Sequence, residues 1–179
     1  MAAATWILLA LGLLGAADIA LFHTLAHGIR RNPESRQEVL VHAFRGPTYA
    51  LLFLAVPNLA MEGGAFLALL VLLGFDLGIS IWDFAIEGAS RRSLGGLPAG
   101  EYVLHVLMAM LFGALAACIL QDAADRVAIP TCLAFRPADV PDWLRGVLAL
   151  MAAGVFVSGL QDALAVVRMG KKDASPPPP

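Results

Sequence analysis

Hydrophobic residues in this chain fall into five long runs, separated by shorter polar segments that contain most of the charged residues, glycines and prolines. A run of about 20 apolar residues in helical conformation is long enough to cross the hydrocarbon core of a bilayer. The sequence therefore predicts an all-α fold, a polytopic transmembrane helix bundle with a four-helix core plus a fifth span. The expected spans cover residues 5–26, 38–56, 65–87, 100–120 and 144–167.

The overall composition favours the same class of protein. Hydrophobic residues make up 59% of the 179 residues and charged residues only 15%, whereas a soluble domain is nearer half apolar and a quarter charged. A net charge of −2 without a basic patch argues against nucleic-acid binding. Two cysteines, Cys118 and Cys132, give neither a disulfide framework nor a Cys-x-x-Cys metal motif. No charged segment precedes the first apolar run, so we expect a retained span rather than a cleaved signal peptide.

Basic residues are distributed unevenly between the two sides of such a bundle. Nine of the twelve Lys and Arg residues lie on one side, in or beside the loops after the first and third spans and in the C-terminal tail. They are Arg30, Arg31, Arg36, Arg45, Arg91, Arg92, Arg168, Lys171 and Lys172. Because basic loops stay in the cytoplasm, we expect a protein of the cell (inner) membrane with its N-terminus outside and its C-terminus in the cytoplasm.

The predicted topology divides the chain into four segments. We expect a four-helix transmembrane bundle at residues 1–122, an extracytoplasmic loop at 123–143, the fifth transmembrane helix at 144–168 and a cytoplasmic tail at 169–179. The tail ends in four consecutive prolines and is too short and proline-rich to pack, so we expect it to be disordered.

Each of the first four predicted helices carries two side chains of metal-ligand type, spaced four residues apart. Residues at this spacing lie on one face of a helix, one turn above the other. The pairs are His23 and His27, Glu38 and His42, Asp83 and Glu87, and Glu101 and His105. All four histidines of the chain belong to these pairs.

The predicted topology places all four pairs at the cytoplasmic ends of their helices. Short connections favour antiparallel neighbours, so the eight side chains are expected to point into one half of the bundle. Four carboxylates held together there without a cation would repel one another in a medium of low dielectric constant. We therefore predict a metal centre on the cytoplasmic side that holds two metal ions. Carboxylate and imidazole ligands without a thiolate favour iron, with manganese or zinc as the alternatives.

Polar residues deeper in the membrane are further candidates. Asp76 lies seven residues before Asp83, hence on the same helix face but nearer mid-membrane, and Asp18 lies at comparable depth. Two interpretations are open for them: a proton path or substrate contact, or a hydrogen-bonded pair that locks two helices together. Arg45 lies on the ligand face of the second span and can offset one negative charge. Asp76 and Arg45 are therefore our candidate catalytic residues.

Several of these residues also form a pattern found in a known family. They are Asp18, His23, the run Glu38-x-x-x-His42-x-x-Arg45, the run Trp82-Asp83-Phe84-x-x-Glu87, and the run Leu97-Pro98-x-x-Glu101-x-x-x-His105. Over about residues 10–120 the chain resembles a family of small bacterial multi-spanning membrane proteins without an assigned function, some of which look fused to domains like nucleotide-sugar epimerases. The resemblance implies a shared site but no activity. The architecture alone is also similar to that of four-helix di-iron carboxylate proteins, whose ligand motif has a different spacing.

The leading hypothesis is a membrane-embedded metal-dependent oxidoreductase, with a di-iron or other di-metal centre. Its lipid-soluble substrate, a quinol or another apolar molecule, would enter from the lipid bilayer. Three alternatives stay open: a zinc-dependent hydrolase of lipid amides or esters, a haem-binding membrane protein, and a non-enzymatic transporter or accessory subunit. The fifth span carries none of the paired ligands, so we expect it to cover one side of the bundle or to contact a partner or a second copy.

Overall fold

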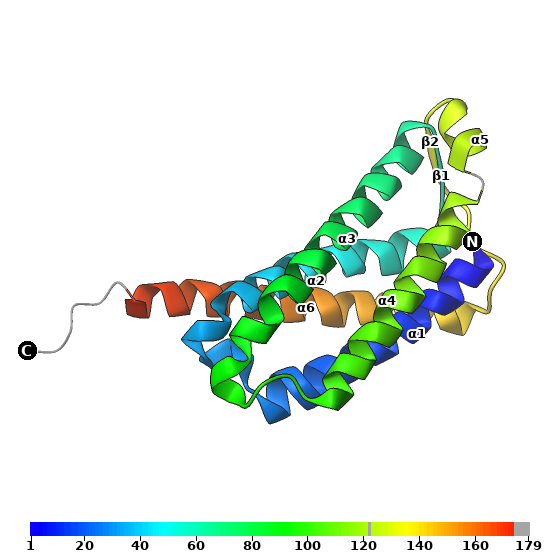
Figure 1. Cartoon of the computed structure of the whole chain (residues 1–179). Helices are drawn as coiled ribbons and strands as arrows, with labels where there is room; N and C mark the ends of the chain where they lie inside the picture. Colours follow the sequence, from blue (N-terminus) through cyan, green and yellow to red (C-terminus); the bar gives the residue numbers. More distant parts are fainter. Residues whose placement is uncertain (122, 174–179) are drawn as a thin grey trace, which may run out of the picture.

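The computed structural model describes residues 1–121 and 123–173 and is built almost entirely of helices (Figure 1). The longer helices are α1 (Ala2–Asp18), α2 (Arg36–Asn58), α3 (Gly64–Ser90), α4 (Ala99–Leu120) and α6 (Asp142–Asp173). The shorter elements are a π-helix (Ile19–Ala26), α5 (Ala123–Ala128), the 3-10 turns Ile29–Arg31, Pro33–Ser35 and Arg92–Leu94, and the strands β1 (Leu59–Glu62) and β2 (Cys132–Phe135). The predicted all-α fold is confirmed.

Five helical segments are long and apolar enough to span a membrane, and each coincides with one of the five predicted runs. They are Ala2–Ala26, Pro33–Asn58, Gly64–Ser90, Ala99–Leu120 and Asp142–Gly170. Several helices continue into polar residues beyond the apolar runs. The last one reaches Asp173, because the first proline after its start is Pro176. Residues 169–173 of the predicted tail are therefore helical, and residues 174–179 lie outside the described residues.

The long helices pack largely in pairs (Figure 1). Helix α2 lies along α6, α4 lies along α1, and α3 packs against α2. Residues 1 and 173, where the described chain begins and ends, lie at opposite ends of the molecule (Figure 1).

The two halves of the bundle differ in polarity. Buried apolar side chains from five helices form the main core in the half that contains the N-terminus, among them Leu8, Leu52, Phe66, Leu115 and Leu148. The buried acidic and histidine side chains gather in the other half, where α1 leads into the π-helix, α2 and α4 begin and α3 ends. The apolar half therefore holds the helices together, while the polar half gathers the buried ionisable side chains.

The fifth span covers one side of the bundle through a close helix crossing. A Cβ atom added at Gly46 of α2 would lie 2.7 Å from the Cα atom of Gly159 in α6, and small residues permit such close approach of two backbones. Arg30 adds polar contacts to α6: its Nε donates to Asp162 Oδ1 over 2.5 Å and its Nη2 to the Ser158 hydroxyl over 2.8 Å. Of the two roles expected for this span, the structure shows packing against the bundle.

A two-stranded antiparallel sheet closes the apolar end of the molecule. Strand β1 pairs with β2, with Leu59 opposite Phe135 and Glu62 opposite Cys132. The predicted loop at 123–143 therefore contains α5 and β2 and folds back over the turn between α2 and α3. Because this pairing joins segments far apart in the chain, the local hydropathy pattern does not show it.

Candidate metal centre

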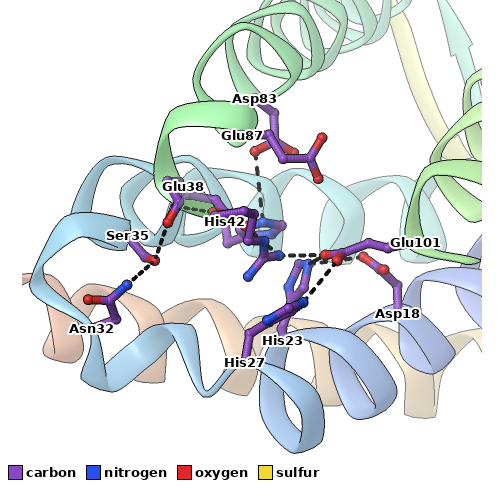
Figure 2. A network of polar contacts seen from close by, with 12 residues as sticks. Asp18, His23, His27, Asn32, Ser35, Glu38, His42, Asp83, Glu87 and Glu101 are labelled. Atoms are coloured by element: carbon purple, nitrogen blue, oxygen red, sulfur yellow. Dashed lines mark hydrogen bonds and ion pairs between the residues drawn. The ribbon is translucent and has the colours of Figure 1, made fainter. Parts of the chain in front are cut away.

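A buried polar cluster lies where the ends of α1, α2, α3 and α4 meet (Figure 2). Ion-pair and ring contacts link all eight ligand-type side chains expected from the sequence into this cluster. Four residues have ligand atoms within 4.8 Å of one another, and we call them the first group: Asp18, His23, Glu101 and His105. Their exposed fractions are 3%, 6%, 0% and 6%.

Distances within the first group suit a shared metal ion. Asp18 Oδ2 lies 3.2 Å from His23 Nε2 and 3.3 Å from His105 Nε2, and Glu101 Oε1 lies 3.4 Å from His23 Nε2. Ligand atoms bound to one ion at about 2 Å are themselves roughly 3 Å apart. The sequence predicts that Glu101 and His105 share an ion with the second and third spans. The structure instead groups them with two residues of the first span.

Asp18 enters the first group because the first span changes its helical form. Residues five apart in an α-helix point about 140° away from each other, so the spacing of Asp18 and His23 does not suggest a pair. The π-helix Ile19–Ala26 begins directly after Asp18. Its hydrogen bonds join residues five apart, which brings His23 onto the same face as Asp18. The sequence does show an acidic residue inside an apolar run, but it does not show which side chain that acid contacts.

A second group shares His23 and adds two residues of α2, Glu38 and His42. The imidazole rings of His23 and His42 lie with their centroids 4.5 Å apart, edge to face. Glu38 is buried, and its Oε2 accepts a hydrogen bond from the hydroxyl of Ser90 at the end of α3. The four-residue spacing of Glu38 and His42 thus points both toward the first group, as the sequence predicts.

The acidic pair of α3 lies at the edge of the two groups. Glu87 Oε1 is 3.0 Å from His105 Nδ1, so it faces a member of the first group from the side opposite Asp18. Asp83 Oδ1 is 3.9 Å from His42 Nε2, and its other oxygen accepts a hydrogen bond from Arg45 over 3.0 Å. Among the described residues, neither carboxylate belongs to a compact ligand group.

His27 follows the π-helix and completes the set of four histidines. Its Nε2 lies 3.5 Å from Glu101 Oε2, and Figure 2 shows its ring beside that of His23. Burial lowers the pKa of His27, and the nearby positive charge of Arg91 lowers it further. The imidazole is therefore neutral at pH 7, which is the form that can ligate a metal.

Arg91 is a central residue of the cluster that the sequence pattern does not reveal. It directly follows α3, in a polar loop that the sequence predicts to be cytoplasmic, yet its exposed fraction is 0%. Its Nη2 lies 2.8 Å from Glu38 Oε1 and 2.5 Å from Glu101 Oε1. The guanidinium therefore joins a carboxylate of the second group to one of the first.

The candidate catalytic residues form a second polar site one to two turns deeper along α3. Arg45 donates to Asp83 over 3.0 Å and to the Ser80 hydroxyl over 2.7 Å. Its Nε lies 3.8 Å from Oδ1 of Asp76, which is fully buried. Asp18, which the sequence predicts at a membrane depth comparable to that of Asp76, instead belongs to the first group. Of the two interpretations left open for these residues, the hydrogen-bonded pair of Asp18 and Asp76 is not found among the described residues.

Charge is unbalanced in this cluster. Six carboxyl groups have exposed fractions of 5% or less: Asp18, Glu38, Asp76, Asp83, Glu87 and Glu101. Two guanidinium groups, those of Arg45 and Arg91, contact them. With all six acids ionised, four negative charges remain without a partner. Protons or bound cations must offset them, because burying an unpaired charge costs much free energy.

Several ligand atoms of the first group also lack hydrogen bonds. Among the described residues, the buried atoms Asp18 Oδ1, His23 Nε2, Glu101 Oε2 and His105 Nδ1 have no hydrogen-bond partner. Some lie at ion-pair distance from a neighbour, but without the geometry of a hydrogen bond. Buried polar atoms are normally paired, so the unpaired atoms of Asp18, His23 and Glu101 could hold a cation, whereas His105 Nδ1 faces Glu87.

Comparisons with known proteins leave the chain without a relative: no protein-family model, no curated protein and no solved structure matches it. The resemblance to the family of small bacterial membrane proteins therefore stays a prediction.

Proposed function

We propose that this protein is a membrane-embedded metal-dependent oxidoreductase that acts on a lipid-soluble substrate. The observation that carries the proposal is the first group. Four buried residues from α1, the π-helix that continues it and α4 offer ligand atoms within 4.8 Å of one another. The surplus of negative charge around the group favours a cation over any neutral ligand.

The donor set supports a redox-active ion. Two imidazoles and two carboxylates without a thiolate suit iron or manganese, which change oxidation state, and also zinc, which does not. When bound, iron or manganese would supply electron transfer, and the residues of the first group would hold the ion and keep bulk water from it. Zinc would favour the hydrolase named above.

Access from the bilayer supports an apolar substrate such as a quinol. Phe84 of α3 is 47% exposed on the outside of the bundle, and its ring centroid lies 5.8 Å from that of His105. Only one aromatic ring therefore separates this ligand of the first group from the surrounding lipid. Trp82 and Tyr102 are also exposed on the same part of α3 and α4 and suit a membrane–water interface.

The deeper site supports a role in proton transfer. Oxidation of a hydroxyl substrate releases protons, and buried ionisable groups inside a span are functional by default. We assign this role to Asp76 and to Arg45, which joins Asp76 to Asp83 at the edge of the cluster. The side of the membrane follows from the basic loops: the cluster lies at the end that carries Arg30, Arg31, Arg91 and Arg92. That end is proposed to be cytoplasmic, in the inner membrane.

Metal analysis of the purified protein, followed by a reaction with oxygen, tests the proposal. We expect the wild type to retain iron or manganese, and the reduced iron-loaded protein to consume oxygen faster when a quinol is added. The Asp83→Ala variant is expected to lose that acceleration, because Arg45 loses its nearest carboxylate. Glu34→Gln is the matched control, since Glu34 is an exposed acid at the same end of the molecule.

Three outcomes would contradict the proposal. Zinc alone in the purified protein would favour the hydrolase, and a Soret band would indicate haem. Protein that binds no metal after careful purification and loading would leave only a transporter or an accessory subunit.

A further inference from the structure

The two groups of candidate ligands are not equally free to bind an ion. Three residues of the first group, Asp18, His23 and Glu101, have a buried ligand atom without a hydrogen-bond partner among the described residues, and Nε2 of His105 faces Asp18. In the second group, both oxygens of Glu38 are in use. Oε1 lies 2.8 Å from Arg91 Nη2, and Oε2 accepts from the hydroxyl of Ser90.

Arg91 occupies the boundary between the two groups. Its Nη2 contacts Glu38 of the second group and Glu101 of the first, and its side chain is fully buried. An arginine keeps its proton in proteins, so a fixed positive charge lies beside the carboxylate that a second ion would need. Two cations at such a distance repel strongly where water is excluded.

We infer that Arg91 takes the place of a second metal ion, so that the centre holds one ion, in the first group, rather than the two that the sequence predicts. Glu101 then serves both partners: Oε1 contacts Arg91, while Oε2 has no hydrogen-bond partner among the described residues. This inference rests on the proposed function, because it assumes that the first group binds metal.

A centre with a single metal ion limits the class of reaction that we propose for the protein. The first group offers two histidines and two carboxylates to one ion, one carboxylate more than the ligand set of non-haem iron(II) oxygenases. When bound, one iron would supply electron transfer, and the substrate would be a lipid-soluble quinol that gives two electrons and two protons to oxygen, leaving a quinone and hydrogen peroxide.

Manganese(II) serves as the probe, because its paramagnetic resonance spectrum separates an isolated ion from a coupled pair. The detergent-purified full chain is loaded with excess manganese(II), freed of unbound ion and analysed for metal per chain. We expect one ion per chain and the spectrum of an isolated ion in the wild type. Arg91→Gln removes the fixed charge and is expected to raise the content toward two, with the spectrum of a coupled pair.

Arg92→Gln is the matched control, since Arg92 is the exposed neighbour of Arg91, and it is expected to stay at one ion. Should Arg91→Gln fail to fold, two other variants test the same inference. Glu38→Gln is expected to keep its ion, and Glu101→Gln is expected to lose it. Two coupled ions in the wild type would overturn the inference but leave the proposed function standing. Folded Arg91→Gln that stays at one ion would also overturn it. A wild type without any ion would overturn both.

Discussion

At the scale of single residues, Glu101 connects the parts of the cluster. It is fully buried and lies 3.4 Å from His23, 3.5 Å from His27 and 2.5 Å from Arg91. A carboxylate has two oxygens that each accept more than one contact, so Glu101 can face an arginine on one side and a metal ion on the other. An amide or hydroxyl at this position would lack the charge that both partners need.

Asp18 gives the sharpest test of the ligand set, because the sequence does not pair it with any histidine. Asp18→Asn keeps the volume and removes the charge, so we expect metal affinity to fall by at least about tenfold, the range found even for residues that only support a ligand. Metal titration of the folded variant measures this. Glu34→Gln, which removes an exposed charge, is expected to bind as the wild type does. Equal affinity in Asp18→Asn would remove Asp18 from the centre.

At the scale of elements, two local features place the site. The π-helix turns His23 toward Asp18, and the 3-10 turn Arg92–Leu94 follows Arg91 as the chain leaves α3. Helix α2 presents Glu38 and His42 from its first turns while α6 supports its outer side. The position of α2 therefore depends on its crossing with α6, which contributes no ligand.

This crossing predicts the effect of adding one methyl group to α2. A Cβ at Gly46 would lie 2.7 Å from Gly159 Cα and 2.8 Å from the carbonyl oxygen of Val155. Both neighbours are backbone atoms that cannot move aside. We expect Gly46→Ala to lower the free energy of unfolding by about 1–3 kcal/mol, the usual range for overpacking. Thermal unfolding in detergent, followed by circular dichroism, measures the change.

Gly78→Ala on α3 is the matched control, since nothing lies within 4 Å of the added Cβ atom. Alanine also favours a helix over glycine by about 1 kcal/mol, so this variant is expected to be as stable as the wild type or more stable. An unchanged melting temperature in Gly46→Ala would show that α2 and α6 are farther apart than described.

At the scale of the whole molecule, polarity and charge run along the bundle. The apolar core and the β1–β2 sheet lie at one end, and the ligand cluster with most of the basic residues lies at the other. In the proposed orientation the sheet faces outward and the cluster lies near the cytoplasm. In the proposed function, oxygen would then reach the centre from the cytoplasm and the lipid-soluble substrate from the bilayer.

The orientation is tested with the chain's own cysteine. Cys132 is exposed on β2, so an impermeant thiol reagent applied outside right-side-out vesicles is expected to label it. In a Cys132→Ser and Cys118→Ser background, Ser93→Cys lies at the opposite end, where Ser93 is exposed, and is expected to react only after the vesicles are opened. The reverse pattern would invert the orientation and move the cluster to the outer side.

Much of this molecule is determined by the sequence alone. Five apolar runs of spanning length predict five helices, because helices satisfy every backbone hydrogen bond inside lipid. The four-residue spacings predict which side chains share a helix face, because that periodicity is fixed by the backbone. Short loops between antiparallel helices bring the four pairs to one end. These are local properties, so they could be read without the fold.

Only the tertiary structure decides which of these side chains meet. Asp18 joins His23 because of a π-helix, a change of backbone form that the apolar pattern of residues 19–26 does not signal. Arg91 lies in a short polar segment of the sequence, which predicts an exposed side chain. It is buried because two acids from other helices, Glu38 and Glu101, converge on it. Ion pairing between distant segments depends on how the helices are placed in space. For that reason the sequence predicts a metal centre at this end of the bundle, while the structure determines how its ligands are grouped.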